Sequence, residues 1–264
     1  VKDLSRGADP LPQVGAWVPR TAKRDQPFVA LSFEPDVPRL HGPPPTSALY
    51  RCLISSLVWD LAAVTRERIK IEFAVGDARE TRPVTLPVRG FEDYVKTVVG
   101  AIDPSLSPRV QFVASVPERT RVALVPTSDA MPALTAAFVN GQRCEEGTHV
   151  SAVASAAARS LNDEAKRQPK KYGALLGARR SVTATFVQRH VCMFIDARVT
   201  SPTFGDQIKS KLNTRDLGWR IAVPQEAARA LARAGVLDAA TAAVEAREAA
   251  AARLTAKNDS TQER

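Results

Sequence analysis

The sequence predicts an α+β fold with a mixed sheet, helices packed on one face of that sheet, and a long Ala-rich helix at the C-terminal end. Short alternating apolar runs are interleaved with apolar residues at helical spacing, a mixture of hairpins and crossovers that favours this class. The run 191–199 is apolar enough for a central strand. Alanine dominates from Asp238 to about residue 257, which indicates the final helix.

The first part of the chain alternates a strand, a linker and a helix. A strand is expected at 28–33, and the proline-rich segment 34–38 stops it. The three successive prolines at 43–45 lack backbone donors, so 41–47 reads as a linker or an insertion. Leucines at 49, 53, 57 and 61, followed by Val64, then give the spacing of an amphipathic helix over 49–64.

The remaining elements follow from local patterns. Glu92 and Asp93 open a helix, as the helix dipole prefers. Gly235 is placed to end a helix, and Asp238 to cap the start of the last one. We therefore expect strands at 69–75, 84–88, 111–116, 121–126, 181–187 and 191–199, and helices at 91–99, 150–161 and 225–234.

Composition limits the possible functions. The 264 residues suffice for one large domain or two small ones, and the net charge of +9 favours a polyanionic partner. Cys52, Cys144 and Cys192 form no CxxC spacing, so we expect reduced thiols in an intracellular protein and neither a zinc site nor a disulfide framework. No apolar run reaches the ~20 residues of a membrane span. The chain begins with Val1 and lacks a signal-peptide pattern, which suggests a piece of a longer protein.

The segment 202–212, PTFGDQIKSKL, is the strongest candidate for chemistry. It follows the predicted central strand and carries Gln207 and Lys209 two residues apart. In an extended turn both side chains can point the same way, so an amide and an ammonium would converge on one anion, most plausibly a phosphate. The alternative is a solvated polar loop.

A second candidate is a basic segment at 166–180, which holds six basic residues and no acidic one. Such a segment either contacts DNA phosphates or is a solvated face. We expect His149, at a predicted helix start, to cap or pack, and we predict no metal site. The basic residues are Lys166, Arg167, Lys170, Lys171, Arg179 and Arg180.

Several motifs in sequence order resemble the transducer region of type IIA DNA topoisomerases in their eukaryotic or large-virus form. They are SFEPD at 32–36, LVWDLA at 57–62, FEDYVK at 91–96, FVN at 138–140, GTHV at 147–150, and the segment 202–212. The resemblance covers nearly the whole chain. It implies the terminal strands of a GHKL-type ATPase domain at 1–36, a transducer of ribosomal-protein-like βαβ fold at 37–222, and a helical arm toward the DNA-cleavage core at 223–264.

The resemblance also implies a function. Such enzymes are homodimers that pass one double-stranded DNA through a break in another, driven by ATP and Mg²⁺, both bound mainly by domains outside this chain. Lys209 would contact the γ-phosphate with Gln207 beside it, and the basic segment would face the DNA. The implied location is the nucleus, or a virus factory or virion if the protein is viral, with no membrane partner.

The chain departs from the family pattern in three places. Ile208 stands where the family loop usually has threonine, Ser55-Ser56 replaces a pair of arginines, and Glu146 replaces the first glycine of a Gly-Gly pair. Two alternatives therefore stay open. One is a non-catalytic DNA-binding module derived from a topoisomerase, and the other is a mismatch-repair or chaperone ATPase of the same superfamily.

Overall fold

A computed structural model describes residues 2–3, 13–14, 39, 42, 44, 47–65, 69–74, 83–176 and 180–262, with side chains described from residue 39 to residue 253 of these ranges. The chain divides into two compact units, Val1–Leu57 and Val58–Arg264. In the first, β1 (Lys2–Asp3) pairs with β2 (Gln13–Val14), and α2 (Ala48–Val64) begins. The strand expected at 28–33 lies outside the described residues, and the domain boundaries at 36 and 222 stay predictions.

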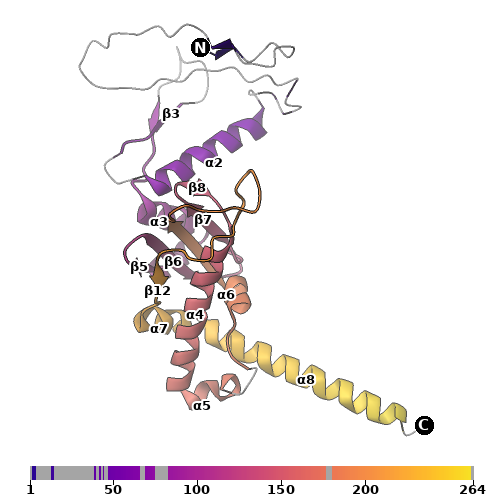
Figure 1. Cartoon of the computed structure of the whole chain (residues 1–264). Helices are drawn as coiled ribbons and strands as arrows, with labels where there is room; N and C mark the ends of the chain where they lie inside the picture. Colours follow the sequence, from indigo (N-terminus) through magenta and orange to yellow (C-terminus); the bar gives the residue numbers. More distant parts are fainter. Residues whose placement is uncertain are drawn as a thin grey trace. The chain divides into compact units, whose positions relative to one another are not determined.

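The second unit is built on a six-stranded mixed sheet of order β12-β5-β6-β10-β7-β8 (Figure 1). Its central strand β10 runs parallel to β7 and antiparallel to β6. The predicted hairpin and the predicted central strand are both confirmed. The strands are β5 (Gln111–Val116), β6 (Thr120–Pro126), β7 (Thr135–Val139), β8 (Gln142–Arg143), β10 (Val191–Ala197) and β12 (Arg220–Ile221).

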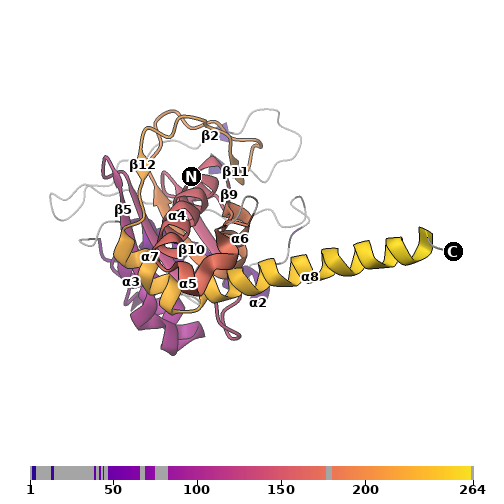
Figure 2. The ribbon, with the colours of Figure 1, turned by 90° about the horizontal axis from the view of Figure 1, so that it is seen from below.

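All seven residues of β10 are buried, and they alternate between two hydrophobic clusters. Met193 and Ile195 join the cluster formed with α4 (Thr148–Arg167), whereas Cys192 and Phe194 join the one formed with α3 (Phe91–Ile102). The two helices therefore lie on opposite faces of the sheet (Figure 2). The α+β class and the mixed sheet are confirmed, but the helices cover both faces because β10 is apolar on both.

The remaining helices extend the layer on the α4 side. The strand predicted at 181–187 is wrong, because the chain forms α6 there. Thr183 caps that helix, its Oγ1 accepting a hydrogen bond from the N–H of Phe186 at 3.2 Å, and Val187 is buried against α4. The helices and helical turns are α5 (Pro169–Tyr172), η2 (Gly173–Leu175), α6 (Ala184–His190), α7 (Gln225–Arg233) and α8 (Val236–Gln262), with η1 (Pro104–Arg109) after α3.

The long Ala-rich helix α8 is confirmed, with one shift in its start. It begins at Val236, so Asp238 lies in its first turn instead of capping it. Its base is buried at Val236, Leu237 and Ala240, and residues 245–253 are exposed. Among the described residues, no helix is both long and apolar enough to cross a membrane.

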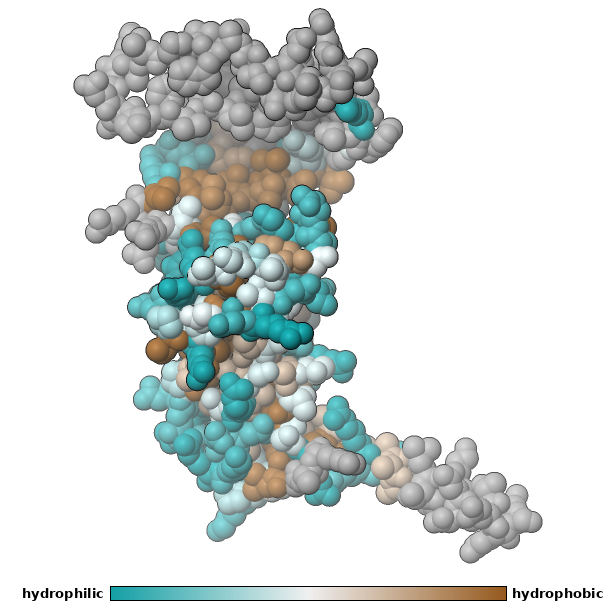
Figure 3. All heavy atoms as spheres, in the orientation of Figure 1, coloured by the Kyte–Doolittle hydropathy of each residue, from teal (hydrophilic) through white to brown (hydrophobic). Residues whose placement is uncertain are grey.

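The apolar stripe predicted on α2 exists, but it is exposed. Leu49, Leu53, Leu57 and Leu61 keep 69%, 54%, 52% and 50% of their surfaces accessible, and the brown band over α2 in Figure 3 includes this face. Val64, also assigned to the stripe, is buried. The strands expected at 69–75 and 84–88 shorten to a two-residue pair, β3 (Glu72–Phe73) with β4 (Val84–Thr85).

The end of α2 is fixed to the sheet by an ion pair. Arg143, on β8, donates from Nε to Oδ2 and from Nη2 to Oδ1 of Asp60, both at 2.7 Å. Asp60 is only 8% exposed, so its charge depends on this partner. Tyr94 of α3 contacts the same carboxylate at 3.5 Å; burial, and then the charge of Asp60, raise the pKa of Tyr94 to about 12.

A second fixed point is a two-stranded parallel pair, β9 (Glu146–Gly147) with β11 (Lys211–Leu212). Gly147 has φ +119°, and a Cβ there would lie 2.6 Å from the nitrogen of Leu212 and closer still to its carbonyl oxygen. Only glycine lets these two backbones approach so closely. This contact thus requires glycine at position 147.

The ion pair predicts a specific loss of stability. Arg143→Met removes both hydrogen bonds to a nearly buried carboxylate, so the free energy of unfolding should fall by about 2–3 kcal/mol in urea titrations. Glu145→Ala is the matched control, because it removes only the exposed ion pair to Nη1 of Arg143 and should cost less than about 1 kcal/mol. Equal losses in the two variants would contradict this assignment.

The close backbone approach predicts a different defect. Gly147→Ala forces β11 away from β9, so stability should fall by about 2 kcal/mol or more and amide exchange across 202–212 should accelerate. Gly173→Ala provides the control, since Gly173 has φ −55° and no neighbouring atom within 4 Å of the new Cβ. Unchanged exchange across 202–212 in the Gly147 variant would rule out the packing described here.

Candidate functional site

The predicted phosphate loop is a small hairpin returning from the sheet to β11. The N–H of Gly205 donates to the carbonyl of Lys211 at 3.0 Å, and the N–H of Asn213 donates to that of Thr203 at 2.8 Å. Phe204 and Leu212 form an antiparallel bridge between these two bonds. Because β11 also pairs with β9, the base of the loop is bonded both across the hairpin and to β9.

The tip of the loop is held by its own hydrogen bonds. The backbone N–H groups of Lys209 and Ser210 donate to the carbonyl and to Oδ1 of Asp206, at 3.2 and 2.9 Å. The Ser210 hydroxyl also bonds to this carboxylate and is the main reason that the pKa of Asp206 lies below its usual value. Gln142 of β8 donates to the carbonyl of Ile208 at 3.2 Å. The backbone of the turn is thus fixed while its side chains face solvent.

Gln207, Ile208 and Lys209 are all exposed at this tip. Lys209 has φ +61°, an uncommon conformation for a non-glycine residue, and its ammonium lies 5.7 Å from the centre of the Phe204 ring. An exposed cation–π contact contributes only about 0.5–1 kcal/mol, so the ammonium can leave the ring for an anion at small cost. Within the described part of the chain, no carboxylate forms an ion pair with Lys209.

Beneath the loop, buried side chains link it to the start of α4. The Cys144 thiol donates to the carbonyl of Ser210 at 3.4 Å, and the carbonyl of Cys144 accepts from Nε2 of His149 at 2.8 Å. His149 is fully buried, and burial lowers its pKa, so the imidazole is neutral with its proton on Nε2. The interpretation of His149 as a packing residue is confirmed.

The basic segment is mostly engaged in ion pairs. Arg167 contacts the nearly buried Glu164, which Arg229 of α7 also approaches at 3.6 Å, so Arg167 contributes to α4–α7 packing. Across 166–176 and at residue 180, Lys170 alone of the predicted residues forms no ion pair. Arg179 lies outside the described residues. The other pairs are Lys166–Asp163 at 2.9 Å, Lys171–Asp238 at 2.9 Å and Arg180–Glu248 at 2.7 Å.

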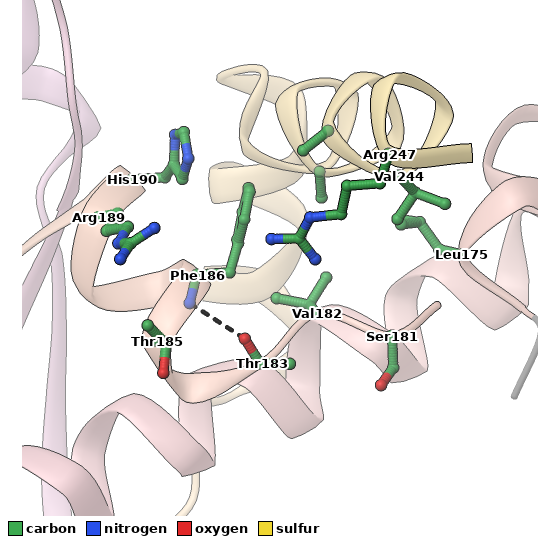
Figure 4. A pocket seen from close by; sticks show the side chains of 12 residues that line it. Leu175, Ser181, Val182, Thr183, Thr185, Phe186, Arg189, His190, Val244 and Arg247 are labelled. Atoms are coloured by element: carbon green, nitrogen blue, oxygen red, sulfur yellow. Dashed lines mark hydrogen bonds between the residues drawn. The ribbon is translucent and has the colours of Figure 1, made fainter. Parts of the chain in front are cut away.

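Two cationic residues that the sequence did not single out line a cavity of about 230 Å³ between α6 and α8. They are Arg189 and Arg247, and Figure 4 shows the latter extending from α8 toward Phe186. They are 58 positions apart in the chain, and neither belongs to a motif or a charge run. Only the folded structure places them around one cavity.

Comparisons with known proteins connect the fold to a family. A family model described as DNA gyrase B matches residues 90–260. DNA topoisomerase 2 of Penicillium chrysogenum is 22% identical over 195 residues, which cover 71% of this chain and 11% of that protein. DNA topoisomerase 2 top-2 of Caenorhabditis elegans is 24% identical over 157 residues, or 58% of this chain and 10% of that protein. The chain thus spans about a tenth of these relatives.

The solved structures that resemble this chain are also of topoisomerase II. The ATPase region of Saccharomyces cerevisiae topoisomerase II, bound to ICRF-187 (dexrazoxane), superimposes with a TM-score of 0.59 at 19% identity, covering 80% of this chain and 49% of that one. The ATPase and transducer domains of Balamuthia mandrillaris DNA topoisomerase II give a TM-score of 0.54 at 21% identity, over 74% of this chain and 44% of that one. Because the family model matches well over half of its residues, the chain belongs to the DNA gyrase B family, and its fold is that of the ATPase and transducer region of type IIA topoisomerases.

Proposed function

We propose that this chain is the part of an ATP-dependent type II DNA topoisomerase that senses the γ-phosphate of ATP and couples ATP binding, hydrolysis and dimer closure to DNA strand passage. The observation that carries the proposal is the turn at 206–210. Its backbone is fixed by Asp206 and Gln142, and it presents Gln207 and Lys209 to solvent with no carboxylate paired to the ammonium in the described residues.

The division of the chain follows the same proposal. Residues 1–36 are the terminal strands of the GHKL ATPase domain, 37–222 the transducer and 223–264 the arm toward the DNA-cleavage core. On this division the ATP and most of its ligands belong to domains outside this chain. Lys209 completes a site that the chain alone does not constitute.

The residues at the tip suit a phosphate. An exposed ammonium next to an amide donor can hold a terminal phosphoryl oxygen and stabilise the negative charge that develops on it during transfer. The described part of the chain holds no group of three or more His, Cys, Asp or Glu side chains that could bind a metal ion, so we assign no magnesium ligand here. On this proposal Lys209 contacts the phosphoryl group and Gln207 helps to orient it.

The contacts of the turn with neighbouring elements would couple ATP binding to the rest of the transducer. Its tip bonds to Gln142, and the adjacent Arg143 fixes Asp60 at the end of α2. A force on Lys209 thus reaches β8, β9 and the end of α2 through direct contacts. Loss of the γ-phosphate contact would let the transducer rotate relative to the ATPase domain, a hinge movement biased by one ligand group.

The partners are double-stranded DNA and a second copy of the enzyme, which acts in the nucleus. Both curated relatives are eukaryotic proteins named DNA topoisomerase 2. The basic segment 166–180 contributes DNA phosphate contacts, chiefly through Lys170, because its other described cations are paired with carboxylates. This pairing also weighs against the alternative, a non-catalytic module that binds DNA through the segment alone.

Removing the ammonium tests the sensing role. In the full enzyme, Lys209→Ala should lower ATP-driven strand passage by on the order of a hundredfold, as loss of one preorganised charge contact typically does, and leave ATP-independent DNA cleavage intact. Lys211→Ala serves as the control, since this neighbouring lysine is exposed on β11, outside the tip. If Lys209→Ala relaxed supercoiled DNA as fast as the parent enzyme does, the proposal would be contradicted.

Charge reversal tests the DNA contact. Lys170→Glu should reduce DNA stimulation of ATP hydrolysis several-fold at low salt, with the difference shrinking as salt rises. Lys171→Glu should affect stimulation less, and lower stability instead, because Lys171 is paired with Asp238 of α8. Unchanged stimulation in Lys170→Glu would remove the basic segment from the proposal.

A further inference from the structure

The cavity between α6 and α8 is lined by cationic residues and by no acidic one. Its lining contains Arg189 and Arg247 but no aspartate or glutamate. Among the described residues, neither arginine forms an ion pair, although Glu248, the next residue along α8, pairs with Arg180 at 2.7 Å. Both arginines therefore line a space of about 230 Å³ without a partner anion, Arg247 on one side of the Phe186 ring and Arg189 on the other (Figure 4).

Hydroxyl groups supplement the two arginines at the rim. Ser181, Thr183 and Thr185 line the cavity and are exposed (Figure 4). Oγ1 of Thr183 accepts the capping hydrogen bond from Phe186, which leaves its O–H available as a donor. Guanidinium and hydroxyl donors around an acid-free cavity match an anion with several acceptor oxygens.

The floor of the cavity is apolar and ordered by stacking. Phe186 stacks on His190 with ring centroids 4.1 Å apart, and Val182 and Val244 close the space beside them. Burial, and then the charge of Arg189, lower the pKa of His190, so its imidazole is neutral and adds no charge. The charge of the site therefore rests on Arg189 and Arg247, at the rim and accessible to a large partner.

We propose that Arg189 and Arg247 each bind a phosphate group of the DNA backbone at this cavity. The inference rests on the DNA contact in the proposed function, and it moves the main cationic contact away from the ion-paired segment. A guanidinium group binds phosphate oxygens bidentately, so each arginine can hold one backbone phosphate. Lys170 on α5 is the described cation of the basic segment without an ion pair, and its neighbour Lys171 is paired with Asp238 of α8.

A duplex is favoured over a free phosphate compound for three reasons. The net charge of +9 favours a polyanion over a small ligand. The arginines lie at an open rim, where a backbone phosphate can reach them without entering the apolar floor. One comes from α6 and the other from α8, so a duplex bound to both would also hold α8 against the sheet unit.

The test is the salt dependence of duplex binding by the 264-residue chain. A short fluorescein-labelled DNA duplex is titrated by fluorescence anisotropy between about 50 and 200 mM salt, the range over which counterion release is steep. Each lost phosphate contact should lower the slope of log K against log salt by about 0.9. We expect that loss in Arg189→Gln and in Arg247→Gln, about twice that loss in the double variant, and about a three- to tenfold weaker Kd per substitution at low salt.

Controls distinguish binding at the cavity from a general effect of positive charge on DNA binding. Arg215→Gln removes an exposed arginine that does not line the cavity and should leave the slope unchanged. Parental thermal unfolding in each variant shows that the fold is intact. Unlabelled inorganic phosphate and AMP are added as competitors, and we expect neither to displace the duplex at concentrations near that of the duplex.

The outcomes distinguish this inference from the function on which it rests. Parental slopes in both arginine variants, with duplex binding retained, overturn the cavity site and leave the contact through Lys170 standing. No duplex binding by the parent chain overturns both. Tight, arginine-dependent binding of AMP or inorganic phosphate would assign the cavity to a free ligand and overturn the DNA contact.

Discussion

Strand β10 must be buried on both faces, and most of the second unit follows from that requirement. Its even and odd residues belong to different hydrophobic clusters, so the sheet needs α4 on one side and α3 on the other. The one charged residue of the strand, Asp196, is 3% exposed and is paired with Arg121 at 2.6 Å, as a buried charge requires. The chain passes from β10 through residues 198–201 into the loop at 202–210, and Gln142 of β8 bonds to the tip of that loop, so the sheet also helps to position the turn.

Local sequence patterns predicted the elements that depend on local physics. The helices at 91–99 and 150–161, the hairpin at 111–126 and the strand at 191–199 each carry a clear period and appear as expected. The stretch 181–187 is rich in β-branched residues, so its pattern favoured a strand. The Thr183 cap and burial against α4 make it a helix instead, which is a tertiary effect that propensity does not contain.

The candidate site also combines residues that local sequence predicted with residues that it could not predict. Gln207 and Lys209 were identified because their neighbours in sequence form a motif, and the fold places both on an exposed turn. The orientation of α2 could not be predicted, since helical spacing gives a stripe but not the surface that it faces. Arg189 and Arg247 were missed for a related reason. A cavity assembled from residues 58 positions apart leaves no local signal.

Counting basic residues overestimated the charge that the segment 166–180 offers. Its acidic partners come from elsewhere in the chain, on α4 itself and on α8, so the segment is acid-free only in sequence. In the ion pairs Lys171–Asp238 and Arg180–Glu248, both side chains are exposed to solvent. Salt screens such pairs, so the attachment of α8 beyond its buried base should weaken as ionic strength rises.

Because α8 is long, a small rotation where it is attached produces a large displacement at its far end. Its 27 residues, at a rise of about 1.5 Å each, make a rod of about 40 Å. If this rod pivots as a rigid body on the buried residues Val236, Leu237 and Ala240, a tilt of about 10° moves its far end by about 7 Å. Packing changes too small to disrupt the core at that pivot would therefore become displacements larger than one turn of helix at the other end.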